Sequence, residues 1–223
     1  MFARDALLVA GKDLRIERRS RVALQQILPF GGIVIVMFAF ALDADRTSLP
    51  AAAPGLFWSA VLLAALLAIG RSFTIEEANG ARDGLRLSGI DGGSIFVGKA
   101  LAIAVELFLL EAVLGTAVVA LYGVHLHGAI ILVCTALAAT IGLAATGTVY
   151  GVLATGLRAR DTLVPLLVLP AVTPVMLGAT RAFSAALDGT PSDAWPWVQL
   201  LGAFSLLAIA AGTVAFGPLL EES

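Results

Sequence analysis

Charged residues are scarce in this sequence. Lys, Arg, Asp and Glu make up 13% of the 223 residues, while apolar residues make up 59%. Ordinary soluble domains carry about 25% charged residues. A soluble domain of this length could not bury so much apolar surface, because a large fraction of a small domain stays exposed. The composition therefore excludes a soluble protein and indicates a polytopic membrane protein.

Several motifs of enzymes and metal proteins are also missing. The sequence has no G-x-x-x-x-G-K-[ST], no H-E-x-x-H, no G-x-S-x-G and only one cysteine, Cys134. It therefore lacks a P-loop for nucleotide hydrolysis, a disulfide within the chain and a C-x-x-C-H haem attachment site. We expect no enzymatic activity in this chain, no metal site, no tightly bound cofactor and no nucleic-acid partner.

Six apolar segments are long enough to cross a bilayer as helices. About 20 apolar residues span roughly 30 Å of hydrocarbon, whereas a barrel strand would alternate and be about half as long. The predicted spans are 22–42, 54–71, 99–122, 128–155, 162–183 and 194–216. We therefore predict an all-α integral membrane protein that forms a single transmembrane domain over residues 1–223, with a cytoplasmic tail at 217–223.

Basic residues are distributed unevenly between the predicted connections. Twelve lie before the first span, in or beside the segment 72–98, or after the fourth span, and only Arg46 and Arg181 lie toward the opposite side. Lys and Arg accumulate on the cytoplasmic side of membrane proteins. Both termini and the segment 72–98 are therefore predicted to face the cytoplasm, with the chain in a bacterial inner membrane.

The segment 1–21 is predicted to form an amphipathic helix in the cytoplasmic interface. Leu7, Ala10 and Leu14 follow helical spacing, and the basic side chains lie mostly elsewhere around the helix. Such a helix places Arg and Lys beside the headgroups of membrane lipids. The alternative is a positively charged flank that only sets the topology.

The segment 72–98 is the only long polar stretch between two spans. It is too polar to cross the bilayer and too short to fold as a separate domain. We expect it to dock on a cytoplasmic partner, although charged runs of this kind also occur as solvated loops. The candidate contact residues are Glu76, Glu77, Gly80, Arg82, Asp83, Leu85 and Arg86.

Two acidic residues lie inside the third predicted span. Counting from Lys99, Glu106 lies roughly 10 Å and Glu111 roughly 18 Å into the membrane. Their spacing places them about 140° apart on a helix, so they do not form one paired site. An ionisable residue at this depth is a functional candidate. The alternative is a carboxyl group that hydrogen-bonds a neighbouring helix.

The fourth and fifth spans carry helix-packing and helix-breaking residues. Pro165, Pro170 and Pro174 predict a broken or strongly curved fifth helix. Pro170 and Pro174 are candidates for a mobile transport pathway, with static packing as the alternative. Gly147 and Gly151 form a G-x-x-x-G pair that allows close packing, either within the subunit or across a homodimer.

Two histidines lie in the short outer connection 123–127. His125 and His127 alternate in sequence, so an extended segment would point both to one side. They are candidate ligands for a haem or a metal presented at the outer surface. The alternative is two solvated side chains, since one short loop supplies no supporting hydrogen bonds.

Three short motifs occur along the chain in the order of a known family. They are the basic stretch 12–21, Pro54-Gly55-Leu56-Phe57-Trp58 at the entry of the second span, and Leu169-Pro170 with Pro174-Val175 in the fifth. With the six spans and the length, they resemble the haem exporter protein B (CcmB) family of bacterial cytochrome c maturation systems. The polar loop departs from the family pattern, because residues 80–85 and a proline-free Gly92-Gly93 replace a Gly-Ser/Thr-Leu-Glu stretch and its following proline.

The resemblance implies a permease-like subunit of an ABC-type complex that handles haem for c-type cytochromes. Its partners would be a cytoplasmic ATPase, a second haem-handling membrane subunit and a small single-span subunit. Haem would be a transported or transiently bound ligand, ATP would act only through the ATPase, and the segment 72–98 would be the coupling loop. Two alternatives remain: an ABC-2-type exporter permease for a lipid, polysaccharide or drug, and an assembly scaffold that transports nothing.

Overall fold

The computed structural model describes residues 1–21, 23–42, 48–78, 84, 89–124, 126, 128–154 and 160–222. All the regular elements within these ranges are helices. A short π-helix, η1 (Ala23–Ile27), precedes the second α-helix. The α-helices are α1 (Phe2–Ser20), α2 (Leu28–Ala41), α3 (Ser48–Ala78), α5 (Gly92–Tyr122), α6 (Ala129–Leu153), α7 (Arg160–Leu187) and α8 (Pro191–Glu222).

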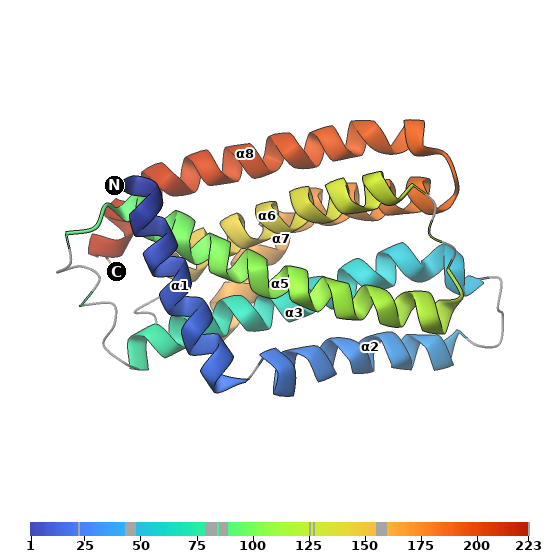
Figure 1. The fold of residues 1–223 in the computed structure, drawn as a ribbon, viewed down its shortest axis with the longest axis horizontal. Helices are drawn as coiled ribbons and strands as arrows, with labels where there is room; N and C mark the ends of the chain where they lie inside the picture. The colour runs from blue at the N-terminus through green and yellow to red at the C-terminus, as the bar shows by residue number, and fades with distance from the viewer. Residues whose placement is uncertain are drawn as a thin grey trace.

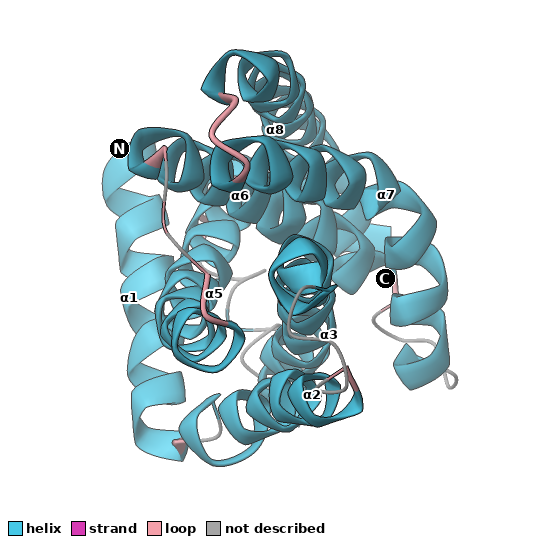
Figure 2. Cartoon of the chain, turned by 90° about the vertical axis from the view of Figure 1, so that its right-hand side faces the viewer, coloured by secondary structure: helices cyan, strands magenta, loops and turns pink. Residues whose placement is uncertain are grey.

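The helices from α2 onward lie side by side in a bundle, and α1 crosses this bundle at one end (Figure 1). Both chain termini lie at that same end. Helix α6 contacts α3, α5, α7 and α8. Helix α2 packs at the edge of the bundle against α3 and α5 (Figure 2).

Five helices of the described chain are long and apolar enough to cross a membrane. They are α3, α5, α6, α7 and α8, so the chain is a multi-pass helical membrane protein. A sixth crossing is obtained only if α1 and the segment Gln25–Ala41 count as one span bent by 57°. The predicted first span, 22–42, corresponds to η1 and the 14-residue α2, which alone covers about 21 Å.

The predicted polar loop 72–98 is wrong at both ends. Helix α3 continues to Ala78, and α5 begins at Gly92. The start of α5 is fixed by Asp91, whose carboxylate accepts a hydrogen bond from the backbone N–H of Ser94 at 3.1 Å. Such N-caps satisfy the free amides of a first helical turn. The polar composition of these turns suggested a loop, but a helix can continue into water beyond the apolar part of its sequence.

Helix α7 is continuous, so the prediction of a broken helix at the prolines is wrong. Pro165, Pro170 and Pro174 all lie inside Arg160–Leu187. Pro170 and Pro174 are exposed, while Val168 and Val172 on the opposite face are buried. Because the rings of Pro170 and Pro174 point away from the bundle, they do not disturb the packed face.

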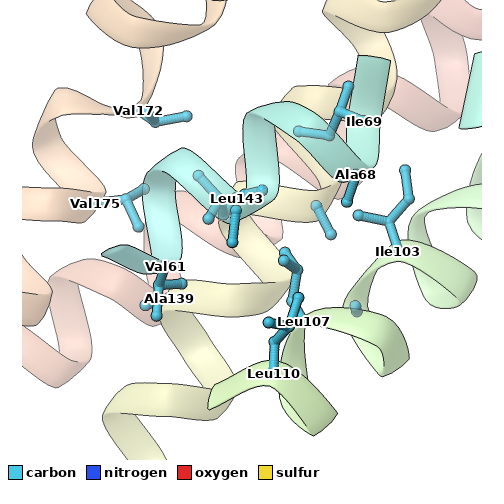
Figure 3. Packing of buried hydrophobic residues seen from close by; sticks show 14 of the residues in the cluster. Val61, Ala68, Ile69, Ile103, Leu107, Leu110, Ala139, Leu143, Val172 and Val175 are labelled. Carbon is cyan, nitrogen blue, oxygen red and sulfur yellow. The ribbon is translucent and has the colours of Figure 1, made fainter. Parts of the chain in front are cut away.

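Aliphatic side chains from α3, α5, α6 and α7 meet in one part of the hydrophobic core (Figure 3). Its members include Val61, Ala68, Ile69, Ile103, Leu107, Leu110, Ala139, Leu143, Val172 and Val175.

The glycines of the fourth predicted span pack within the chain. A Cβ atom at Gly147 would overlap Ile69, and one at Gly151 would overlap the ring of Phe73, both on α3. A Cβ atom at Gly142 would lie 2.8 Å from the hydroxyl of Ser205 on α8. The glycine face is therefore occupied by α3 and α8, and it offers no support for a homodimer.

The N-terminal segment forms a helix, as predicted, and one side of it packs against the bundle. Ala6, Val9 and Ala10 are buried, whereas Leu7 is 63% exposed. Small side chains form the buried face because α1 crosses close to α5.

Candidate functional site

A buried ion pair joins α1 to α5 where the two helices cross. The side chain of Lys99 is almost fully buried, with 1% of the residue exposed. Its Nζ lies 3.5 Å from Oδ2 of Asp13. The other oxygen of this carboxylate, Oδ1, lies 3.0 Å from Nζ of Lys12. Two ammonium groups therefore share one carboxylate, and one of them is removed from solvent.

Helix α3 also contributes to this crossing. The ammonium of Lys99 lies over the ring of Phe73, 4.8 Å from its centroid. An aromatic face attracts a cation, more strongly when water is excluded. Lys99 therefore links α5 to α1 and to α3. The sequence placed it at the edge of the polar segment 72–98, whereas the structure places it within α5.

The close approach of α1 and α5 depends on a glycine beside this lysine. A Cβ atom at Gly98 would lie 2.6 Å from the carbonyl oxygen of Ala6 and 2.7 Å from Cβ of Val9. Only glycine leaves room for the α1 backbone at this point.

A second charged contact lies one turn further along α1. Oε2 of Glu17 lies 3.6 Å from Nε of Arg71 on α3. Glu106 of α5 lines the same cavity as Glu17. Its Oε1 is buried and has no hydrogen-bond partner among the described residues. The end of α1 therefore makes a charged contact with α3, and the carboxyl group of Glu106 on α5 lies nearby.

The second acidic residue of α5 lies in a different place. Glu111 is 6% exposed, and the hydroxyl of Thr140 on α6 donates a hydrogen bond to its Oε1. Its Oε2 has no partner in the part of the chain that the structure describes. Glu111 also lines a cavity of about 360 Å³, whose wall includes the rings of Phe57, Phe108 and Phe183. This is the interhelix hydrogen bond that the sequence left open as an alternative.

The structure thus separates the two glutamates, as their helical spacing predicted. Glu106 faces the end of α1, and Glu111 faces α6 and the aromatic cavity. Pro170 and Pro174 are on the exposed face of α7 and line neither place.

The comparisons with known proteins cover nearly the whole chain. The model of the CcmB protein family matches residues 4–223. This chain belongs to the CcmB family. Among its relatives are proteins named haem exporter protein B. The alignments cover more than nine-tenths of this chain and of each relative. The one from Bradyrhizobium diazoefficiens is 32% identical, over 96% of each chain. The one from Pseudomonas aeruginosa is 30% identical, over 92% of this chain and 94% of the relative.

The candidate docking residues of this CcmB-family chain lie only partly within the described structure. Glu76 and Glu77 belong to the last turn of α3, at the end of the bundle where α1 crosses. The other docking candidates lie outside the described residues: Gly80, Arg82, Asp83, Leu85 and Arg86. The haem-ligand candidates His125 and His127 also lie outside them. Among the residues that are described, no group of three His, Cys, Asp or Glu side chains could hold a metal ion.

Lys99 and its partner Asp13 were not among the site residues predicted from the sequence. The available signal was a lysine within the apolar stretch GGSIFVGKALAIAV. The same stretch contains Gly93-x-x-x-x-Gly98-Lys99, but Ala100 stands where a P-loop needs Ser or Thr. In the structure these residues are helical, and Lys99 contacts Asp13 and Phe73. A phosphate-binding loop is therefore absent from this segment.

Proposed function

We propose that this chain is the membrane subunit of a haem exporter that supports the formation of c-type cytochromes. The observation that carries the proposal is the family match over residues 4–223. Relatives named haem exporter protein B align over more than nine-tenths of this chain in Bradyrhizobium diazoefficiens and Pseudomonas aeruginosa. Haem would be the transported substrate, and a separate ATPase would supply the energy.

The proposed contact with the ATPase lies at the end of the bundle that carries α1 and both termini. Helix α3 ends there at Ala78, and α5 begins there at Gly92. The distribution of basic residues supports a cytoplasmic position for this end. The segment between the two helices, with Glu76 and Glu77 beside it, would then meet the ATPase.

The charged contacts of α1 would transmit a movement of this segment. Lys99 lies seven residues after the start of α5, and Arg71 lies in the last third of α3. Both side chains are paired with carboxylates of α1. A partner that displaces the α3–α5 connection would therefore shift α1 together with the two helices that enter the membrane.

The test of the proposed function is haem attachment to c-type cytochromes in cells that lack this chain. We expect the haem-stained c-type cytochromes to disappear on deletion and to return when the intact chain is supplied. A chain with Arg82→Glu and Arg86→Glu should restore at least about tenfold less haem-stained c-type cytochrome than the intact chain. The reason is that reversed charges repel a complementary partner surface. The matched control is Arg158→Glu with Arg160→Glu, which reverses two charges in another predicted cytoplasmic connection and should restore normally.

Two results would contradict the proposal. Normal c-type cytochromes in the deletion strain would favour an exporter of a lipid, polysaccharide or drug. A scaffold without transport predicts normal function after Glu111→Leu, Pro170→Ala and Pro174→Ala, together with failure of the reversed loop. A transport pathway predicts that both sets of substitutions impair haem attachment.

A further inference from the structure

A cavity of about 450 Å³ lies at the elbow where the chain turns from α1 into α2. Helices α1 and α2 both contact α5. We call it the elbow cavity. It is lined by Leu14, Glu17, Arg18, Arg21, Leu28, Glu106, Leu109, Leu110 and Val113.

The lining of the elbow cavity changes from charged to apolar along α5. Arg18 and Arg21 line the cavity from the end of α1. Leu109 and Val113 follow Glu106 on α5, and they are 67% and 51% exposed. Val113 lies about 10 Å beyond Glu106 along the helix. A site with charge at one end and an apolar wall at the other fits an amphipathic molecule.

The arginines at the charged end are available for a ligand. Glu17, their nearest acidic neighbour in sequence, is paired with Arg71. Within the described part of the chain, no ion pair involves Arg18 or Arg21. Guanidinium groups bind phosphate through two parallel hydrogen bonds.

Arg21 also has an unusual backbone. Its φ is 55°, in the left-handed region, and its N–H donates to the carbonyl of Glu17 at 3.0 Å. Glycine is the residue usually found at such a helix end. Arg21 holds this position although glycine would adopt the same backbone conformation without strain.

Glu106 supplies a second, independent sign of a ligand. Its Oε1 is buried without a hydrogen-bond partner among the described residues, and the residue lines the elbow cavity. A buried carboxyl oxygen gains free energy from a donor. A ligand that carries an ammonium group next to a phosphate would satisfy Glu106 and the two arginines together.

We propose that the elbow cavity binds one molecule of phosphatidylethanolamine from the adjacent leaflet. Its phosphate lies between Arg18 and Arg21, its ammonium donates to Glu106, and an acyl chain lies along Leu109 and Val113. Phosphatidylcholine has the same phosphate but no N–H donor, and phosphatidylglycerol has no cation. The site therefore distinguishes three lipids by headgroup chemistry, independently of whether the chain exports haem.

The test is native mass spectrometry of the intact protein, released from mild detergent after titration with each of the three lipids. We expect phosphatidylethanolamine to be retained about tenfold better than phosphatidylcholine, as for one lost hydrogen bond to a charged group. Glu106→Gln should bring the two lipids close to equal retention. Arg18→Gln with Arg21→Gln should reduce the retention of both by about tenfold or more.

The same helix offers a matched control. Arg15 and Arg19 line a separate hollow on α1 with Leu7 and Leu8, so Arg15→Gln with Arg19→Gln removes the same charge elsewhere. This variant should retain phosphatidylethanolamine like the unaltered chain. Equal loss in both double variants, or strongest retention of phosphatidylglycerol, would overturn the proposal. Haem that displaces the lipid in a manner that depends on Arg18 and Arg21 would also overturn the proposal. The cavity would then be a substrate site.

Discussion

Replacing Asp13 by leucine is expected to destabilise the protein by about 3–5 kcal/mol. The substitution takes the paired carboxylate away from Lys99, whose ammonium is buried between α1, α3 and α5. Removing one partner of a buried pair costs this much because the other charge remains desolvated. The thermal midpoint should fall by about 10 °C, since a chain of this length loses roughly 2–4 °C per kcal/mol.

The decisive comparison is the double variant Asp13→Leu with Lys99→Met. Replacing both members of a buried ion pair by apolar residues is often neutral or stabilising. We therefore expect the double variant to unfold within a few degrees of the unaltered chain, well above Asp13→Leu alone. Thermal unfolding in one detergent, followed by circular dichroism, measures all three proteins. Additive losses in the double variant would show that Lys99 is not held by this pair.

Replacing Gly98 by alanine is expected to detach α1 from α5. The added methyl group would lie 2.6 Å from the carbonyl oxygen of Ala6, which is backbone and cannot rotate away. Overpacking of this kind costs about 1–3 kcal/mol. Alanine is the better helix former by about 1 kcal/mol, so a loss of stability here must come from the contact with α1.

Hydrogen–deuterium exchange of the α1 amides measures this detachment. The amides of Phe2–Ser20 should exchange faster in Gly98→Ala, while those of α6 should change little. Gly32→Ala on α2 is the matched control, because nothing lies within 4 Å of a Cβ atom at that position. Unchanged protection of α1 in Gly98→Ala would contradict the close crossing of the two helices.

The sequence predicted the helices well and their ends poorly. Hydropathy located five spans that the structure contains, because a continuous apolar run in a membrane has few alternatives to a helix. It did not show that α3 reaches Ala78 or that α5 begins at Gly92. Those turns are polar, and their helical state depends on caps such as Asp91.

The prolines of α7 show that the effect of a helix-breaking residue depends on the face of the helix on which it lies. Three prolines predicted a broken or strongly curved helix, and the structure contains one continuous helix. Pro170 and Pro174 lie on its exposed face, where the missing hydrogen bonds leave the packed face intact. The sequence gives the spacing of the rings, but which face they occupy depends on neighbouring helices.

The candidate site was predicted in part. A carboxyl group within a span drew attention to Glu106 and Glu111, and the spacing correctly separated them. The partners of these residues could not be predicted, because Thr140 is 29 positions from Glu111. Lys99 and Asp13 are 86 positions apart, and only the crossing of α1 over α5 brings them together.

The most direct test of the proposed role is co-purification of this chain with an ATPase subunit from membranes in mild detergent. An ATPase subunit identified by mass spectrometry, with nucleotide hydrolysis in the same fraction, is the expected result. Arg82→Glu with Arg86→Glu should release it, whereas Arg158→Glu with Arg160→Glu should not. If no ATPase accompanies the unaltered chain, or if the reversed loop retains it fully, the proposed coupling through the α3–α5 connection is contradicted.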